Sequence, residues 1–154
     1  MALLDDGATY SNEGRIKLVN YSKAKRDQDL VTFKAHDSGI GALKLSPDGS
    51  LVATASVKGT LIRIFETHTG KQVNEVRRGA EKAKICDIII DPENQYLSCS
   101  SDTGTVHIFS IASKEVENKK SVFSSLGGSY FSSQWSFGQF KVNDPRCKIA
   151  LLPM

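Results

Sequence analysis

Cysteine is scarce in this sequence of 154 residues, and the three that occur form no CxxC pair. Because Cys86, Cys99 and Cys147 are odd in number and lack metal-ligand spacing, we expect neither a disulfide framework nor a zinc site. Cys86 and Cys99 lie in apolar, strand-like runs. The thiols are therefore predicted to be buried and reduced, which suits the cytosol.

Long apolar runs are also missing. No stretch approaches the roughly 20 apolar residues that span a bilayer, and the first residues show no signal-peptide pattern. The 20 Lys and Arg residues nearly balance the 17 Asp and Glu residues, for a formal net charge of +3. This mild excess by itself indicates neither nucleic-acid nor membrane binding. With 40% hydrophobic and 24% charged residues, the composition is that of one soluble domain with a core.

The residue types of an enzyme active site do not occur together. His36, His68 and His107 are scattered along the chain, no nucleophile lies in a recognisable elbow, and no metal-ligand cluster is present. The sequence therefore predicts a protein that is not an enzyme and needs no cofactor or metal. The basic stretch also lacks the interleaved aromatic residues on which nucleic-acid bases stack, so no nucleic-acid partner is expected.

The sequence does contain an internal repeat, in which two segments are copies of each other offset by about 45 residues. Each copy has short strand-like runs with a proline-containing turn between the first two. The predicted strands span residues 40–45, 51–56, 60–65 and 71–76 in the first copy, and 85–90, 96–101 and 105–109 in the second. Thr60 aligns with Thr105 at an offset of 45, but Arg63 aligns with His107 at 44. The extra residue in the first copy predicts a β-bulge.

A period near 45 residues with four short strands is typical of propeller blades. The alternative is a generic antiparallel sheet or sandwich, which does not require the fixed spacing. We predict an all-β fold, a partial WD40-type β-propeller with about two complete four-stranded antiparallel blades and flanking strands of two more. Such a unit cannot close by itself, so edge-to-edge self-association is a further expectation.

The predicted organisation follows from the repeat. Residues 1–13 are expected to be a disordered start or a foreign remnant, and 14–154 the partial propeller. Within the propeller the predicted parts are the end of one blade at 14–35, a blade at 36–79, a blade at 80–143 with a long loop at about 112–134, and the first strand of the next blade at 144–154.

Positive charge collects between the two copies, around Val76-Arg77-Arg78-Gly79. The stretch 58–84 holds seven Lys and Arg residues against three acidic ones. Adjacent arginines can project in different directions and each serve a separate anion, if hydroxyl donors complete the two pockets. Each copy supplies a serine, a threonine after a glycine, and a basic residue, namely Ser56, Thr60 and Arg63 or Ser101, Thr105 and His107. The alternative is that the hydroxyls only satisfy turn backbone and the arginines are solvated.

These residues resemble a known family. The stretches 55–65, 76–79 and 101–109 are similar to the PROPPINs, the WIPI-like seven-bladed WD-repeat propellers that bind phosphoinositides in autophagy, and 130–137 resembles the segment that closes their sixth blade. The resemblance implies recognition of phosphatidylinositol 3-phosphate and phosphatidylinositol 3,5-bisphosphate at two headgroup sites. The implied first site is His36, Thr54, Ser56, Thr60, Arg63 and Arg77; the implied second site is Arg78, Ser101, Thr105 and His107. Val76 stands where the family usually has Phe or Leu, and we expect it to pack as an anchor.

The segment 112–134 is too long for a plain connection. The family has a membrane-inserting loop at this place, and the resemblance assigns that role here to Lys119, Lys120, Val122, Phe123 and Leu126. Trp135 and Phe137 are instead predicted to be core residues of a fourth strand that ends at Val142. If His107 binds phosphate as a cation, affinity for the second site should fall from pH 6 to pH 8.

Two functions remain open from the sequence. The first is a phosphoinositide-binding scaffold, cytoplasmic and peripheral on autophagic or endosomal membranes, with autophagy proteins as partners. The alternative is a WD-repeat protein-interaction scaffold whose basic rim binds acidic peptides.

Overall fold

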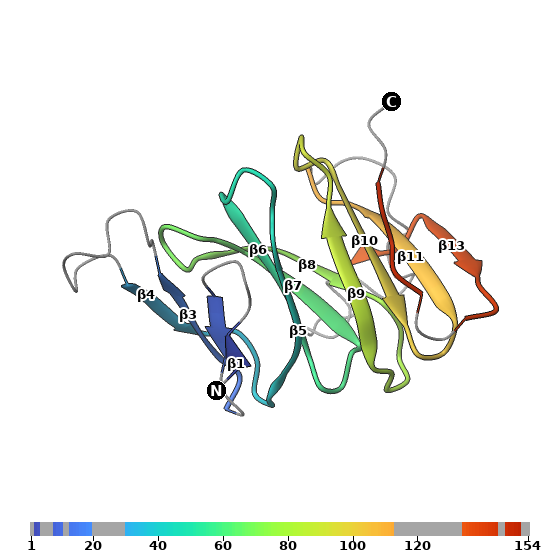
Figure 1. The fold of residues 1–154 in the computed structure, drawn as a ribbon, viewed down its shortest axis with the longest axis horizontal. Helices are drawn as coiled ribbons and strands as arrows, with labels where there is room; N and C mark the ends of the chain where they lie inside the picture. Colours follow the sequence, from blue (N-terminus) through green and yellow to red (C-terminus); the bar gives the residue numbers. More distant parts are fainter. Residues whose placement is uncertain are drawn as a thin grey trace, which may run out of the picture.

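The structure is a computed structural model that describes residues 2–3, 8–10, 13–19, 30–112, 134–144 and 147–151. Within these ranges the regular secondary structure consists of strands, which form three mainly antiparallel sheets lying side by side (Figure 1). The predicted all-β class is confirmed. A search of the described residues found no helix with the length and apolarity to cross a membrane.

The first sheet has the strand order β1-β2-β3-β4. Its strands are β1 (Ala2–Leu3), β2 (Ala8–Tyr10), β3 (Arg15–Val19) and β4 (Leu30–Lys34). The first two lie within residues 1–13, where the sequence analysis expected disorder. They form because the outer edge of β3 carries backbone donors and acceptors, and β2 pairs with that edge.

The second sheet contains β5 (Ile40–Leu45), β6 (Leu51–Ser56), β7 (Leu61–Glu66) and β8 (Gln72–Arg77), paired antiparallel in chain order. A fifth short strand, β12 (Gln134–Trp135), pairs parallel with the outer edge of β8.

The third sheet contains β9 (Ile85–Ile90), β10 (Tyr96–Ser101), β11 (Thr105–Ser110) and β13 (Gly138–Lys141), in the order β13-β11-β10-β9.

The predicted fourth strand of the second blade is therefore divided between two sheets. Trp135 lies beside Arg77 of β8, and only Gly138–Lys141 pairs with β11. The prediction that Trp135 and Phe137 belong to one strand is wrong, because the chain changes sheets between these two residues.

The extra residue of the first copy does not make a bulge in the β6–β7 ladder, which pairs Ala55 with Ile62 and Thr54 with Arg63 without interruption. Four residues (57–60) separate β6 from β7, whereas three (102–104) separate β10 from β11. The predicted bulge is therefore wrong, and the extra residue lengthens a turn. As a result Thr60 lies in a turn, although its counterpart Thr105 begins a strand.

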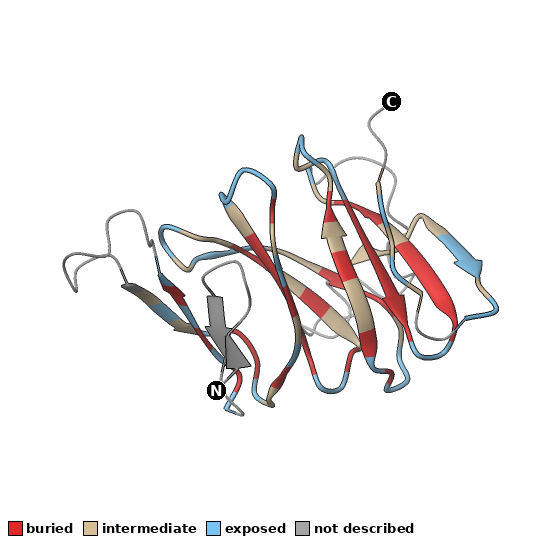
Figure 2. Ribbon diagram, in the orientation of Figure 1, coloured by how far each residue is buried: buried red, intermediate tan, exposed pale blue. Residues whose placement is uncertain are grey.

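Two apolar cores hold the sheets together, and Figure 2 shows the buried residues alternating along the strands that face each other. The core between the first and second sheets contains Ile16, Leu43, Val52 and Phe65, among others. The core between the second and third sheets contains Ala53, Ala55, Ile62, Ile64, Val76, Ile88, Leu97, Cys99 and Phe109, among others. Val76 is fully buried there, which confirms its predicted packing role.

Residues 147–151 lie along β9 and β10 without a strand assignment, although the sequence predicts the first strand of the next blade there. Side chains make the contacts: Ser100 Oγ donates to the Cys147 carbonyl at 2.8 Å, and Asp87 Oδ2 accepts from the Ile149 N–H at 3.1 Å. A strand needs a backbone ladder, and these contacts do not supply one.

Candidate anion-binding sites

Arg77 and Arg78 lie on opposite sides of the second sheet. Side chains alternate along a strand, and Val76 points into the core shared with the third sheet, so Arg77 at the end of β8 faces the first sheet. Arg78 follows the strand and turns toward the third sheet, where its positive charge acts on His107. Both side chains are buried, with 3% and 7% of their surface exposed.

The predicted hydroxyls occupy the same face of each sheet. Thr54 alternates with Ala53 and Ala55 and pairs across the ladder with Arg63, so both face the first sheet. In the third sheet Cys99 and Phe109 face the second sheet. Ser101, Thr105 and His107 share that face by alternation. Each set therefore lies on the side toward the preceding sheet.

At the first site, His36 reaches β6 from the segment after β4. Its Nε2 lies 3.0 Å from Thr54 Oγ1 and 3.3 Å from the Thr54 carbonyl oxygen. Burial, together with the positive charge of Arg63, lowers the pKa of His36 to about 4. The ring is therefore neutral at pH 7 and can donate one hydrogen bond from a ring nitrogen.

Arg63 connects β8 with the segment that follows β4. Its Nε donates to Glu75 Oε2 at 2.8 Å, and its Nη1 donates to the Ala35 carbonyl at 2.7 Å. The Arg63 side chain is 27% exposed, but its charge is already paired with Glu75. An anion would have to share this guanidinium with Glu75.

Ser56 and Thr60 lie at the two ends of the β6–β7 turn. The Ser56 hydroxyl accepts the Lys58 N–H at 3.3 Å, which is the backbone role that the alternative interpretation assigned to it. The Thr60 carbonyl accepts the Arg78 N–H at 2.9 Å. Gly59 has φ +63°, and a Cβ there would lie 1.8 Å from the Ala83 carbonyl oxygen. Glycine is therefore required for this turn to approach the segment before β9.

Arg78 is held by backbone carbonyls. Its Nε donates to the Gly59 carbonyl at 2.9 Å, and its Nη2 donates to the Glu81 carbonyl. No carboxylate is involved in either bond. Arg78 thus fastens the β6–β7 turn to the chain before β9 and keeps its positive charge beside the third sheet.

Three hydroxyls form a triangle at the second site. Ser101 Oγ lies 2.8 Å from Thr103 Oγ1 and 3.0 Å from Thr105 Oγ1, and the two threonine oxygens are 3.0 Å apart. Hydroxyl hydrogens rotate, so each of these groups can turn its O–H toward an anion. The sequence analysis missed Thr103. The alternation Ser-x-Thr-x-Thr across the turn at Gly104 is the signal that could have found it.

His107 lies opposite Cys99 and stacks on Phe109 with ring centroids 6.2 Å apart. Burial, followed by the positive charge of Arg78, lowers its pKa to about 4. In the free protein His107 is therefore neutral across pH 6–8, and the predicted loss of second-site affinity over that range is not expected from its titration.

The two sites differ at one aligned position. Cys99 stands in the second copy where Thr54 stands in the first, and burial raises the pKa of this thiol to about 12. The second site therefore has a buried thiol in place of the hydroxyl that contacts His36 in the first.

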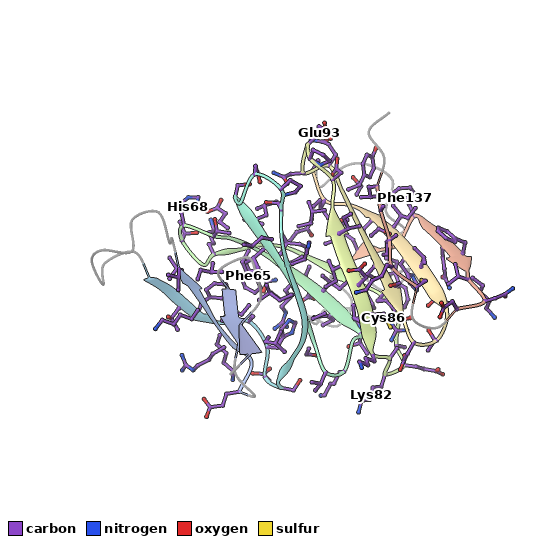
Figure 3. The ribbon with its side chains drawn as sticks, viewed as in Figure 1. Phe65, His68, Lys82, Cys86, Glu93 and Phe137 are labelled. Atoms are coloured by element: carbon purple, nitrogen blue, oxygen red, sulfur yellow. The ribbon has the colours of Figure 1, made fainter. Side chains whose placement is uncertain are left out.

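The predicted loop residues Lys119, Lys120, Val122, Phe123 and Leu126 lie outside the described residues. A cavity of about 560 Å³ lies at the other end of the strands, where Pro47 and Pro92 line it. Figure 3 shows Glu93 at that end and Lys82 at the end that carries Arg78. The described residues contain no group of three His, Cys, Asp or Glu that could hold a metal ion.

Comparisons with known proteins bear on these sites. A family model described as PROPPIN matches residues 9–145. SVP1-like protein 2 of Kluyveromyces lactis is 34% identical over 151 residues, which cover 92% of this chain and 44% of the relative. Autophagy-related protein 18 of Kluyveromyces marxianus is 44% identical over 93 residues, which cover 60% of this chain and 18% of the relative.

A solved structure, Kluyveromyces lactis Hsv2 with its complete loop 6CD, matches with a TM-score of 0.68 at 34% identity. The match covers 86% of this chain and 41% of that structure. The chain thus spans less than half the length of the relatives it matches.

Proposed function

Because this chain belongs to the PROPPIN family, we propose that it binds membranes carrying phosphatidylinositol 3-phosphate or phosphatidylinositol 3,5-bisphosphate through two headgroup sites. PROPPINs are non-enzymatic β-propeller scaffolds, so binding is the activity to be explained. The first site is His36, Thr54, Ser56, Thr60, Arg63 and Arg77, and the second is Arg78, Ser101, Thr105 and His107, to which the structure adds Thr103.

One observation supports the proposal: consecutive arginines at the end of β8 are directed to opposite faces of one sheet, and predicted hydroxyls lie on the matching faces of the second and third sheets. Guanidinium groups and hydroxyls are the donors that a phosphate monoester accepts. Neutral histidines at both sites add N–H donors without adding charge.

Two headgroup sites on one molecule bind a membrane more tightly than either site does alone. A basic side chain near an anionic leaflet contributes about 1 kcal/mol, and an apolar side chain that enters the bilayer adds roughly 1.5–3 kcal/mol. Neither holds a protein on a membrane alone. Two headgroups and the loop around Phe123 would act together, since the first contact raises the effective concentration for the next.

We infer from the same reasoning that the protein is peripheral on autophagic or endosomal membranes, with autophagy proteins as partners. Relatives named autophagy-related protein 18 support this assignment. Association between copies along open sheet edges remains a proposal as well.

The test is flotation with phosphatidylcholine vesicles that contain phosphatidylinositol 3-phosphate, compared with vesicles that contain phosphatidylserine at matched charge. The wild-type chain should float with the first and much less with the second. Arg77→Ala combined with Arg78→Ala should abolish the difference. Lys82→Ala combined with Lys84→Ala removes the same charge from exposed positions of the same stretch and should leave it intact.

Two results would contradict the proposal. Equal loss of flotation in both double variants would show that general charge, rather than the two sites, binds the vesicles. Unchanged flotation after loss of both arginines would refute the site assignment. Because Arg78 also bonds the Gly59 and Glu81 carbonyls, circular dichroism must first show that the arginine variant is folded.

A further inference from the structure

The chain that returns from segment 113–133 passes directly over the second site. Gln134 and Trp135 pair with β8 of the second sheet, and two residues later the Phe137 N–H donates to the Ile108 carbonyl of β11 at 3.1 Å. Phe137 also packs edge-on against Tyr96, with ring centroids 6.0 Å apart. Ser136 is therefore held in place from both sides.

Ser136 contacts one nitrogen of the His107 ring. Its Oγ lies 3.2 Å from His107 Nδ1. The other nitrogen, Nε2, makes no hydrogen bond to another residue within the described part of the chain. It is therefore the ring nitrogen left to meet a ligand.

The protonation pattern of a neutral imidazole depends on its hydrogen bonds. One ring nitrogen carries the proton and the other accepts, and the bond made by one nitrogen decides the role of the other. Arg78 is the charged neighbour that acts on this ring, and together with burial it keeps His107 neutral. His107 can then offer an N–H to an anion from Nε2 only if Nδ1 is the unprotonated nitrogen, and a hydrogen bond donated to Nδ1 favours that tautomer.

We propose that Ser136 is a positioning residue of the second anion site: its hydroxyl donates to His107 Nδ1, which places the ring proton on Nε2 and presents that N–H to a bound phosphate. This inference rests on the proposed function for its ligand, although the ring state can be observed in the free protein. The proposal also gives a role to residues 134–137, which would align a hydrogen-bond donor of the second site.

The first site provides an internal contrast. There Nε2 of His36 is the nitrogen that contacts Thr54, at 3.0 Å from the hydroxyl oxygen, and among the described residues no hydroxyl contacts Nδ1 of His36 as Ser136 contacts Nδ1 of His107. A change at Ser136 should therefore alter His107 and leave His36 unchanged.

The first experiment is long-range nitrogen–proton NMR of the ¹⁵N-labelled chain without ligand at pH 7. The wild type should show His107 with its proton on Nε2. Ser136→Ala should shift His107 toward a mixture of both tautomers, and Ser136→Thr, which keeps the hydroxyl, should restore the wild-type pattern. Ser38→Ala, which removes a hydroxyl two positions after His36, is the matched control and should leave His107 unchanged.

The second experiment measures binding in an Arg77→Ala background, where the second site carries the interaction. With vesicles containing phosphatidylinositol 3-phosphate, Ser136→Ala should weaken binding roughly two- to tenfold, the range expected for one lost hydrogen bond. Ser136→Thr should restore it.

The outcomes separate the two proposals. A wild-type His107 with its proton on Nδ1, or a tautomer that Ser136→Ala leaves unchanged, would overturn the role of Ser136. So would a changed tautomer with unchanged second-site binding. If the wild-type chain does not discriminate phosphoinositide vesicles at all, the proposed function fails, while the tautomer measurement still decides whether Ser136 sets the ring.

Discussion

Acidification should destabilise this protein mainly through two buried histidines. His36 and His107 each have a pKa lowered from 6.5 to about 4, by burial and by a neighbouring arginine. As the pH falls below 6.5, the unfolded chain takes up protons at these residues before the folded chain does, which favours unfolding. The effect grows until the pH reaches the folded pKa near 4. It corresponds to about 3 kcal/mol for each histidine between pH 7 and pH 4.

The assay is urea unfolding followed by circular dichroism at several pH values between 7 and 4. His36→Gln and His107→Gln remove one titrating group each, so each variant should lose about 3 kcal/mol less than the wild type over this range. His68→Gln is the control, because the His68 side chain is 73% exposed. A domain of typical stability has only about 5–15 kcal/mol to lose. The wild type should therefore be close to unfolding at pH 4.

The comparison among variants is decisive. If His36→Gln and His107→Gln follow the same pH dependence as the wild type and His68→Gln, the two rings do not stay neutral through burial, and the electrostatic description of both sites is wrong. If only one of the two variants shows a smaller pH dependence than the wild type, a buried neutral histidine is supported only at the site of that variant.

Two further predictions concern the turn and the first site. Gly59→Ala should destabilise the fold several times more than Gly49→Ala, because only at Gly59 would the new Cβ meet the Ala83 carbonyl oxygen. Gly49→Ala should cost about 1 kcal/mol, for its positive φ alone. Equal shifts of the two variants in thermal unfolding would contradict this. Glu75→Gln should strengthen first-site binding to phosphoinositide vesicles, because it weakens the hydrogen bond that competes for Arg63. Weaker binding with an intact fold would contradict this and show that Glu75 is needed to orient Arg63.

Local pattern was sufficient for the first two strands of each repeat and for the direction of the arginines. The runs Ile40–Leu45, Leu51–Ser56, Ile85–Ile90 and Tyr96–Ser101 are strands with the predicted bounds. Residues in a strand alternate between two faces, so neighbouring residues at its end are directed to opposite sides by the chain itself. The repeat of about 45 residues then places the aligned hydroxyls on equivalent faces of adjacent sheets.

Contacts between residues far apart in the sequence could not be predicted from local pattern. Nothing in the pattern around Trp135 indicates that β12 leaves its own blade and pairs with β8. Likewise, the partners of Arg63 at Ala35 and of His107 at Ser136 are separated by 28 and 29 positions in the chain.

The electrostatic character of the sites was decided by tertiary structure alone. A histidine has no fixed charge in a sequence, and the sequence left open whether His107 binds phosphate as a cation. Packing of two sheets removes water from its ring and brings the charge of Arg78 close, so the folded protein keeps it neutral. The residue types came from the sequence, but their protonation and their hydrogen bonds depend on neighbours that only folding brings together.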